Sequence, residues 1–295
     1  MSSRYDFIVS GGAAASVPLA YFGVGYDGNV TLAAGITTLT REMQYNNLTL
    51  AAGAILKPNG NRILVRGTLT IAAGGSINDN GNNASGLTGG LNLTAINYLR
   101  ALCAGGSNGR NTTGTGQPTI SVGFVAPNNT GATPQAGNGG TGGGANVGGI
   151  AAGNSLVTPS QTWHTQAVWG SARASVGPFS GGGGGAGGGC DITGGTATSG
   201  GGGGSAGVVW IAAYLMANSG TISANGGAGG NAVQTLAASA GGGGGGTGGL
   251  VAVITGSAAA GTVTATGGVG GTGAGLLGTN GFPGTGGATT ILVLA

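Results

Sequence analysis

Few residues of this chain could perform acid–base chemistry. The acidic residues are Asp6, Asp27, Glu42, Asp79 and Asp191, and the only histidine is His164. Asp27 and Glu42 could act as the carboxylate pair of a glycosidase if stacked repeats brought them together. A simpler interpretation is that Asp27 belongs to a turn at residues 26–28 and that Glu42 pairs with a nearby arginine. We therefore expect no enzymatic activity.

The sequence also lacks the patterns that hold metals and nucleotides. Gly-x-Gly-x-x-Gly matches carry no information in a chain with 75 glycines, because a dinucleotide site also needs a βαβ unit and a downstream acid. The only lysine, Lys57, precedes a proline and so forms no phosphate-binding loop. Residues 192–295 contain no charged side chain, and calcium needs carboxylate oxygens. We predict neither a metal nor a cofactor.

Two groups of aromatic residues are the candidates for binding. The first lies close together in the sequence, is the candidate surface or receptor contact, and consists of Trp163, His164, Trp169 and Phe179. Such rings offer flat apolar faces for sugars or proteins. The simpler interpretation is that they fill a small core beside glycine, because large aromatic rings are usually buried. The second group is the candidate docking surface to a larger assembly and consists of Tyr5, Phe7, Tyr21 and Phe22.

The composition excludes several classes of protein. Glycine makes up 75 of 295 residues, charged residues only 4%, and the net charge is +3. Runs such as residues 241–246 break the collagen period, and the mean hydropathy of +0.27 argues against disorder. The scattered basic residues predict no nucleic-acid binding, and no apolar stretch is long enough for a membrane helix. Cys103 and Cys190 could pair with each other, but two cysteines make no disulfide framework, and free thiols are the simpler expectation.

Four regions differ in composition. Residues 1–25 form an apolar, partly aromatic segment that we interpret as an attachment segment. Residues 26–100 hold most of the charges and an internal repeat, residues 101–180 are rich in Gly, Asn and Thr, and residues 181–295 alternate polyglycine with short apolar segments.

The first repeat predicts stacked β-strands. Its three copies are residues 29–38 (NVTLAAGITT), 47–56 (NLTLAAGAIL) and 68–77 (TLTIAAGGSI). Each copy alternates apolar and polar residues and then turns, which is the pattern of a half-buried strand. One such unit cannot bury its apolar face alone, so the repeat predicts a β-solenoid or a stack of repeated sheets.

A second repeat predicts the same for the glycine-rich region. Residues 219–230 recur as residues 260–271, and each copy follows a polyglycine run and an apolar strand. Structured polyglycine must be held by dense backbone contacts, as in packed polyproline II (PPII) chains. We therefore predict an all-β protein with a layered polyglycine region, closed by an apolar strand at residues 289–294.

Residues 22–80 resemble a glycine-rich module of tailed-bacteriophage virion proteins. The motifs that carry the resemblance are residues 27–31 (DGNVT), 39–41 (LTR), 45–49 (YNNLT) and 66–69 (RGTL). The polyglycine half is similar in style to tail-fibre tip adhesins. The resemblance implies a structural or receptor-binding protein of the virion, assembled in the host cytoplasm.

Three functions remain open at this point. A tail fibre for host-surface adhesion is the first hypothesis, and a head fibre or capsid decoration protein that reinforces the shell is the second. A β-solenoid polysaccharide depolymerase is the third and the least favoured. We expect a homo-oligomer, most simply a homotrimer, that contacts other virion proteins and a host glycan or protein.

Overall fold

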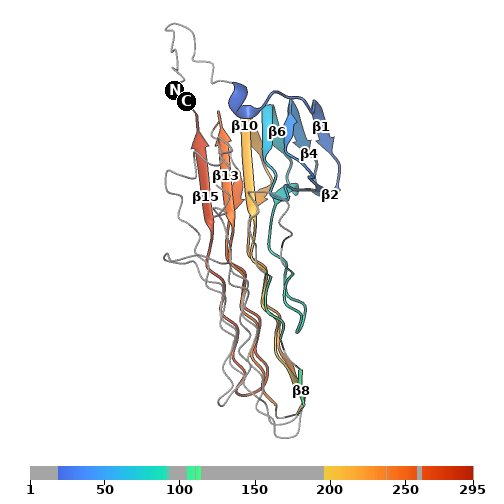
Figure 1. Cartoon of the computed structure of the whole chain (residues 1–295), viewed down its shortest axis with the longest axis vertical. Coiled ribbons are helices and arrows are strands. Elements are labelled where there is room, and N and C mark those ends of the chain that lie inside the picture. Colours follow the sequence, from blue (N-terminus) through green and yellow to red (C-terminus); the bar gives the residue numbers. More distant parts are fainter. Residues whose placement is uncertain are drawn as a thin grey trace, which may run out of the picture.

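The chain folds into parallel β-sheets. The computed structural model describes residues 19–91, 93, 105–109, 111–113, 196–236, 238–257 and 261–294. Within these residues the structure is all-β apart from one short 3-10 helix, η1 (Leu19–Phe22), as the sequence predicts. Two parallel sheets lie at one end of an elongated body, and extended glycine-rich segments run from them to the other end (Figure 1).

The larger sheet has the strand order β1-β4-β6-β10-β13-β15, with β3 also paired to β6. Its strands are β1 (Asn29–Leu32), β3 (Met43–Tyr45), β4 (Asn47–Leu50), β6 (Ile63–Ile71), β10 (Val208–Asn218), β13 (Leu250–Thr255) and β15 (Ala288–Val293). The smaller sheet consists of β14 (Thr262–Thr264), β11 (Thr221–Ser223), β7 (Ser76–Asn78), β5 (Ala54–Lys57) and β2 (Gly35–Thr38). The third sheet is antiparallel and consists of β8 (Asn111–Thr113), β9 (Thr196–Thr198) and β12 (Val233–Gln234).

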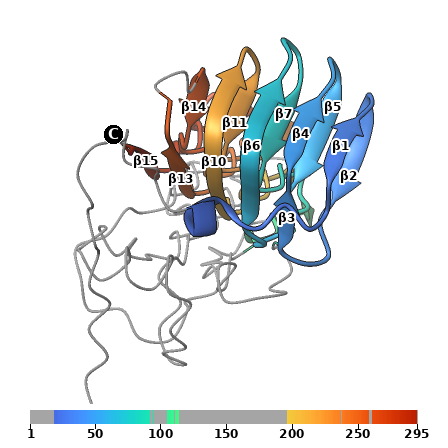
Figure 2. The same cartoon turned by 90° about the horizontal axis from the view of Figure 1, so that it is seen from above.

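The sequence repeats pair side by side in the register that their alignment predicts. Thr31 is the partner of Thr49, and Thr49 is the partner of Thr70, the same three threonines that align in the first repeat. In the second repeat Thr221 is the partner of Thr262. Each repeat places one strand in the larger sheet and the next in the smaller sheet, joined by a short turn (Figure 2). The turn after β4 contains Gly53, whose φ of 76° favours glycine.

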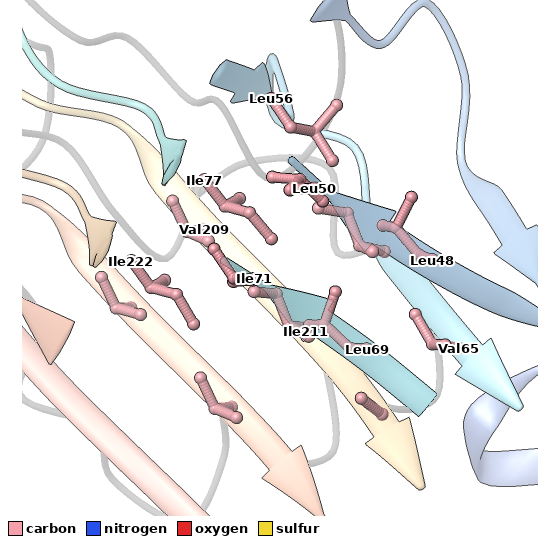
Figure 3. Packing of buried hydrophobic residues seen from close by; sticks show 14 of the residues in the cluster. Leu48, Leu50, Leu56, Val65, Leu69, Ile71, Ile77, Val209, Ile211 and Ile222 are labelled. Atoms are coloured by element: carbon pink, nitrogen blue, oxygen red, sulfur yellow. The ribbon is translucent and has the colours of Figure 1, made fainter. Parts of the chain in front are cut away.

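The main core lies between the two parallel sheets. Alternate residues of the larger sheet, such as Leu48, Leu69 and Ile211, are fully buried in it, together with Ile77 and Ile222 of the smaller sheet (Figure 3). This alternation is what a strand with one buried face requires. The two sequence regions at 26–100 and 181–295 share this core, because β6 pairs with β10 and β7 with β11.

A second apolar cluster lies on the opposite face of the larger sheet. Trp210 and Leu64 are buried there, and η1 packs against β6 and β10 through Phe22. The Phe22 ring meets the Tyr214 ring edge to face, with centroids 5.6 Å apart. Both faces of the central strand β10 therefore pack against apolar side chains, which explains its continuous apolar sequence.

The glycine-rich segments bond to one another through their backbones. Residues 199–207, 238–249 and 278–287 run parallel, with bonds such as Gly200 N–H to Gly241 C=O and Gly242 N–H to Thr279 C=O. Residues 79–84, 224–232 and 265–273 form a second parallel set, as in the bond from Gly226 N–H to Thr266 C=O. The two sets are antiparallel to each other. Within a segment, the donor to a given neighbour recurs at every third residue, as at 243, 246 and 249.

Asparagine side chains supply a further set of bonds along the second parallel set. Asn80 Oδ1 accepts from the Asn225 N–H at 2.7 Å, and Asn83 Oδ1 accepts from the Ala228 N–H at 2.8 Å. In the next segment, Asn225 and Asn231 accept from the Thr266 and Thr272 N–H groups, each at 2.9 Å. Asparagines three or six residues apart therefore satisfy N–H donors of the next segment in the set.

Ala228 interrupts this ladder of asparagines. It stands midway between Asn225 and Asn231, opposite Val269. Ala228→Asn is expected to stabilise the protein by about 1 kcal/mol, because the new carboxamide can accept from the Val269 N–H. Thermal melts would measure the gain, with Asn225→Ala as the matched loss of about the same size. A melting temperature unchanged by either substitution would show that the ladder contributes nothing.

Candidate functional site

The structure describes two of the eight aromatic-group residues that the sequence singles out. Phe22 is fully buried and Tyr21 is half-buried against the same apolar cluster, so the Phe22 ring anchors η1 to the sheet. Its burial removes that ring from any surface that could meet a partner. The other candidates, together with both cysteines, lie outside the described residues: Tyr5, Phe7, Trp163, His164, Trp169 and Phe179.

The carboxylates of Asp27 and Glu42 are each held by a different arginine. Asp27 lies in a turn, as predicted, and its carboxylate accepts bonds from the Arg41 guanidinium and, at 2.7 Å, from the Gln44 N–H. Glu42 forms an ion pair with Arg62, which confirms the predicted arginine pairing. Arg62 also lies over the Trp210 ring, 5.7 Å from its centroid. Gln44 links the two pairs, because its N–H donates to Asp27 Oδ2 and its Nε2 donates to Glu42 Oε1 at 3.4 Å.

The same contacts shift two pKa values. The side-chain hydrogen bond from Arg41 holds the pKa of Asp27 below its ordinary value, and the Gln44 N–H acts in the same direction against the opposing effect of burial. Burial raises the pKa of Tyr45 to about 12. Tyr45 therefore stays protonated at neutral pH and belongs to the core.

We expect the Asp27–Arg41 pair to make the free energy of unfolding fall at acidic pH. The pKa of Asp27 is lower in the folded than in the unfolded protein, so the stabilisation exists above about pH 4 and is lost as the pH falls through the folded value. Asp27→Asn should lower the melting temperature at pH 7, and the gap to the unchanged protein should shrink below pH 4. Paired thermal melts over this range test it, and a gap that stays constant with pH would contradict it.

In the described part of the chain, no three His, Cys, Asp or Glu side chains come together as a metal site. No helix in the described ranges is both long and apolar enough to span a membrane.

The end of the body farthest from the two parallel sheets is built from several converging segments. The antiparallel sheet of β8, β9 and β12 lies there (Figure 1). Ala240 and Ala274 bridge two of the glycine-rich segments, and the Leu277 N–H donates to Ser239 Oγ at 3.2 Å. Buried alanines fill the space between these segments: Ala197, Ala232, Ala238 and Ala240. The turns at this end are thus held by backbone bonds and a small alanine core.

Large aliphatic side chains are exposed on these turns and on strand β12. We call Val233, Leu236, Leu276 and Leu277 the tip patch. Leu276 is fully exposed, Leu236 is 77% exposed, and Val233 and Leu277 are 62% and 51% exposed. Leu236 also has a φ of 56°, a conformation that leucine rarely adopts and that stores on the order of 1 kcal/mol of strain. Exposed aliphatic side chains therefore come from two separate stretches of the chain at this end of the body, residues 233–236 and 276–277.

The sequence analysis missed the tip patch. Leu236, Leu276 and Leu277 sit in turns and Val233 in the two-residue strand β12, and no aromatic side chain marks them. The available signal was the pair Leu276-Leu277, placed between two glycines in a region without charge. Large apolar residues at such a position cannot be core residues of a strand.

Comparisons with known proteins find no similar protein. No family model matches the chain, and neither the curated proteins nor the solved structures contain a match.

Proposed function

We propose that this chain is a fibre-type protein of a tailed-bacteriophage virion and that the tip patch contacts the host surface. The observation that carries the proposal is a group of exposed leucines at the end of an elongated body, opposite the end that holds the two parallel sheets (Figure 1). An apolar patch rimmed by polar residues is typical of a protein-binding surface. Because residues 192–295 carry no charge, the patch would recognise its receptor by shape and apolar contact.

The proposal extends to the finer architecture. The paired repeats would form a β-solenoid, and the glycine-rich segments would form two antiparallel layers of PPII-like chains. Two observations support the layers. The recurrence of donors at every third residue matches the three residues per turn of a PPII helix. A Cβ added at most of these glycines would also overlap the backbone of a neighbouring segment, as Gly227 would with Asn82.

The position on the virion is also a proposal. The N-terminal region would attach the chain to other virion proteins, and the tip would point away from the particle. A head fibre or decoration protein that only reinforces the shell would not need exposed leucines at its far end, one of them strained. The tip patch therefore favours the tail position over the head position.

The test removes the tip side chains without harming the fold. Leu236→Asn relieves backbone strain, because asparagine tolerates the left-handed region, and Leu276→Asn changes a fully exposed residue. The double variant is expected to melt no lower than the unchanged protein. It should lose at least 10-fold in binding to host cells, measured with labelled protein, and phage carrying it should adsorb correspondingly slowly.

Ile36→Thr is the matched control for this experiment. Ile36 is 67% exposed on β2, so the control also replaces an exposed aliphatic residue, but in the smaller parallel sheet. It should leave binding unchanged. Full binding by the Leu236→Asn, Leu276→Asn variant would contradict the proposed role of the tip patch.

A further inference from the structure

The larger parallel sheet ends in two open strands, β1 and β15. Among the described residues, β1 pairs only with β4 and β15 pairs only with β13. Open edges attract further strands, and proteins usually protect them with charges, prolines or bulges. β15 has none of these devices: its sequence is ATTILV, and its pairing with β13 is regular over all six residues. β1, with the sequence NVTL, is equally unprotected.

The glycine-rich segment that precedes β15 has a protected edge, in contrast to β15 itself. In residues 278–287, every third N–H, at positions 281, 284 and 287, donates to the segment 265–273. The carbonyl groups at positions 279, 282 and 285 accept from the parallel segment 238–249. The three-residue pattern leaves positions 280, 283 and 286 to donate outward. Position 283 is a proline, which has no N–H. Extension is therefore blocked beside the glycine segments and left possible at β15.

The hydrogen-bonding groups of the two open strands are complementary. The Ala288 and Leu294 N–H groups point to β13, so the alternation of a parallel ladder turns the groups of Thr289, Ile291 and Val293 outward. On β1, the Leu32 C=O accepts from the N–H of Ala51, the residue that follows β4. By the same alternation, the backbone N–H and C=O groups of Asn29 and Thr31 face outward, away from β4. A parallel pairing of the two strands must then place Ile291 beside Val30 or Leu32.

Side chains agree with this pairing. Ile291 and Val293 lie on the face of β15 that is turned toward the smaller sheet, as their partners Val253 and Thr255 do, yet they are 43% and 46% exposed. No strand of the smaller sheet pairs beyond β14 in the described chain, so nothing of that sheet covers them. Val30 and Leu32, at the other edge, pack against the same core and are half-buried. Pairing of β15 with β1 of another copy would place the apolar side chains of the two strands next to each other on the same face of a continuous sheet.

We propose that copies of this chain associate side by side through unlike edges (head-to-tail pairing), so that β15 of one copy pairs in parallel with β1 of the next. Every strand of the sheet runs in the same direction, so the symmetry axis must lie along the strands. All copies then point the same way, and a cyclic assembly gathers their tips at one end. This goes beyond the proposed adhesion function, and it would allow several weak tip contacts to act together.

Disulfide trapping tests which strands meet. In a background with Cys103 and Cys190 changed to serine, three preparations carry Val30→Cys, Leu32→Cys or Ile291→Cys. Neighbouring residues of paired strands are about 5 Å apart, within disulfide range. Mixing the Ile291→Cys preparation with each of the other two and oxidising them should give cross-linked dimers in one of the mixtures, which no preparation gives alone. Cross-linking of the Ile291→Cys preparation with itself would overturn the proposal, because it requires β15 to meet β15, and so would the absence of any cross-link.

Native mass measurement tests the same contact on intact protein. The unchanged full chain should be an oligomer, with a trimer as the expected closed ring. Ile291→Lys places a charge at the β15 edge, and Thr31→Pro removes an outward donor from β1, so each should yield folded monomers with an unchanged β signal. Val269→Lys, an equally drastic change at an exposed residue outside β1 and β15, should leave the oligomer intact. Monomeric unchanged protein, or oligomers that survive both edge variants, would refute head-to-tail pairing, whereas loss of host binding by the tip variant alone would not affect it.

Discussion

Gly243→Ala is expected to lower the free energy of unfolding by about 3 kcal/mol or more. A Cβ at position 243 would overlap the carbonyl group of Gly201, which belongs to a neighbouring segment of backbone. The backbone there cannot withdraw, because Gly243 itself donates to the Gly230 C=O at 2.9 Å and accepts from the Gly271 N–H at 2.7 Å. Chemical denaturation of both proteins measures the difference. A flexible glycine linker would instead gain slightly from alanine.

Two glycines of one segment provide the matched comparison. A Cβ at Gly284 would overlap the Gly246 carbonyl, whereas a Cβ at Gly286 would meet its nearest neighbour, the Ala265 carbonyl oxygen, at an ordinary 3.5 Å. Neither glycine has a positive φ. Gly284→Ala should therefore destabilise the protein as strongly as Gly243→Ala, and Gly286→Ala should be neutral or slightly stabilising. Equal effects at both positions would contradict close packing of the segments.

Ile211→Ala is the second substitution with a large expected effect, a loss of about 4 kcal/mol. Ile211 is fully buried in the middle of β10, with Ile63 and Val253 as its partners on the two neighbouring strands. Removing its side chain leaves a cavity that three strands border. Leu276→Ala is the control, because Leu276 is fully exposed and should change stability by less than about 0.5 kcal/mol. A similar loss for both variants, measured by denaturation, would contradict this assignment of the core.

The repeats predicted the sheets well because each repeat carries its own register. The aligned threonines at 31, 49 and 70 are direct partners, and the offset between residues 221 and 262 is the offset of a strand pair. The pairing of β6 with β10 was beyond such reasoning. The sequence of neither strand specifies its partner, because any apolar strand of suitable length could bury the same face.

The side-chain bonds of the glycine-rich segments were also missed, for a different reason. Asn80 and Asn225 look like ordinary loop residues in sequence, since asparagine is common in turns. The Asn80 carboxamide oxygen accepts from the N–H of Asn225, 145 positions away, and the Asn225 carboxamide oxygen accepts from the N–H of Thr266, 41 positions away. The leucines of the tip patch were hidden in the same way, because exposure is a property of the folded turn and not of the residue type.

Amide hydrogen exchange of residues 265–273 tests most directly whether the glycine-rich segments are a packed part of the fold. The Gly268 and Gly271 N–H groups donate to Gly246 and Gly243, whereas no acceptor within the described residues faces those of Gly267, Val269 and Gly270. We predict slow exchange at 268 and 271 and fast exchange at 267, 269 and 270, a pattern with a period of three. Uniformly fast exchange across the segment would show that the glycines are flexible spacers and would contradict the account.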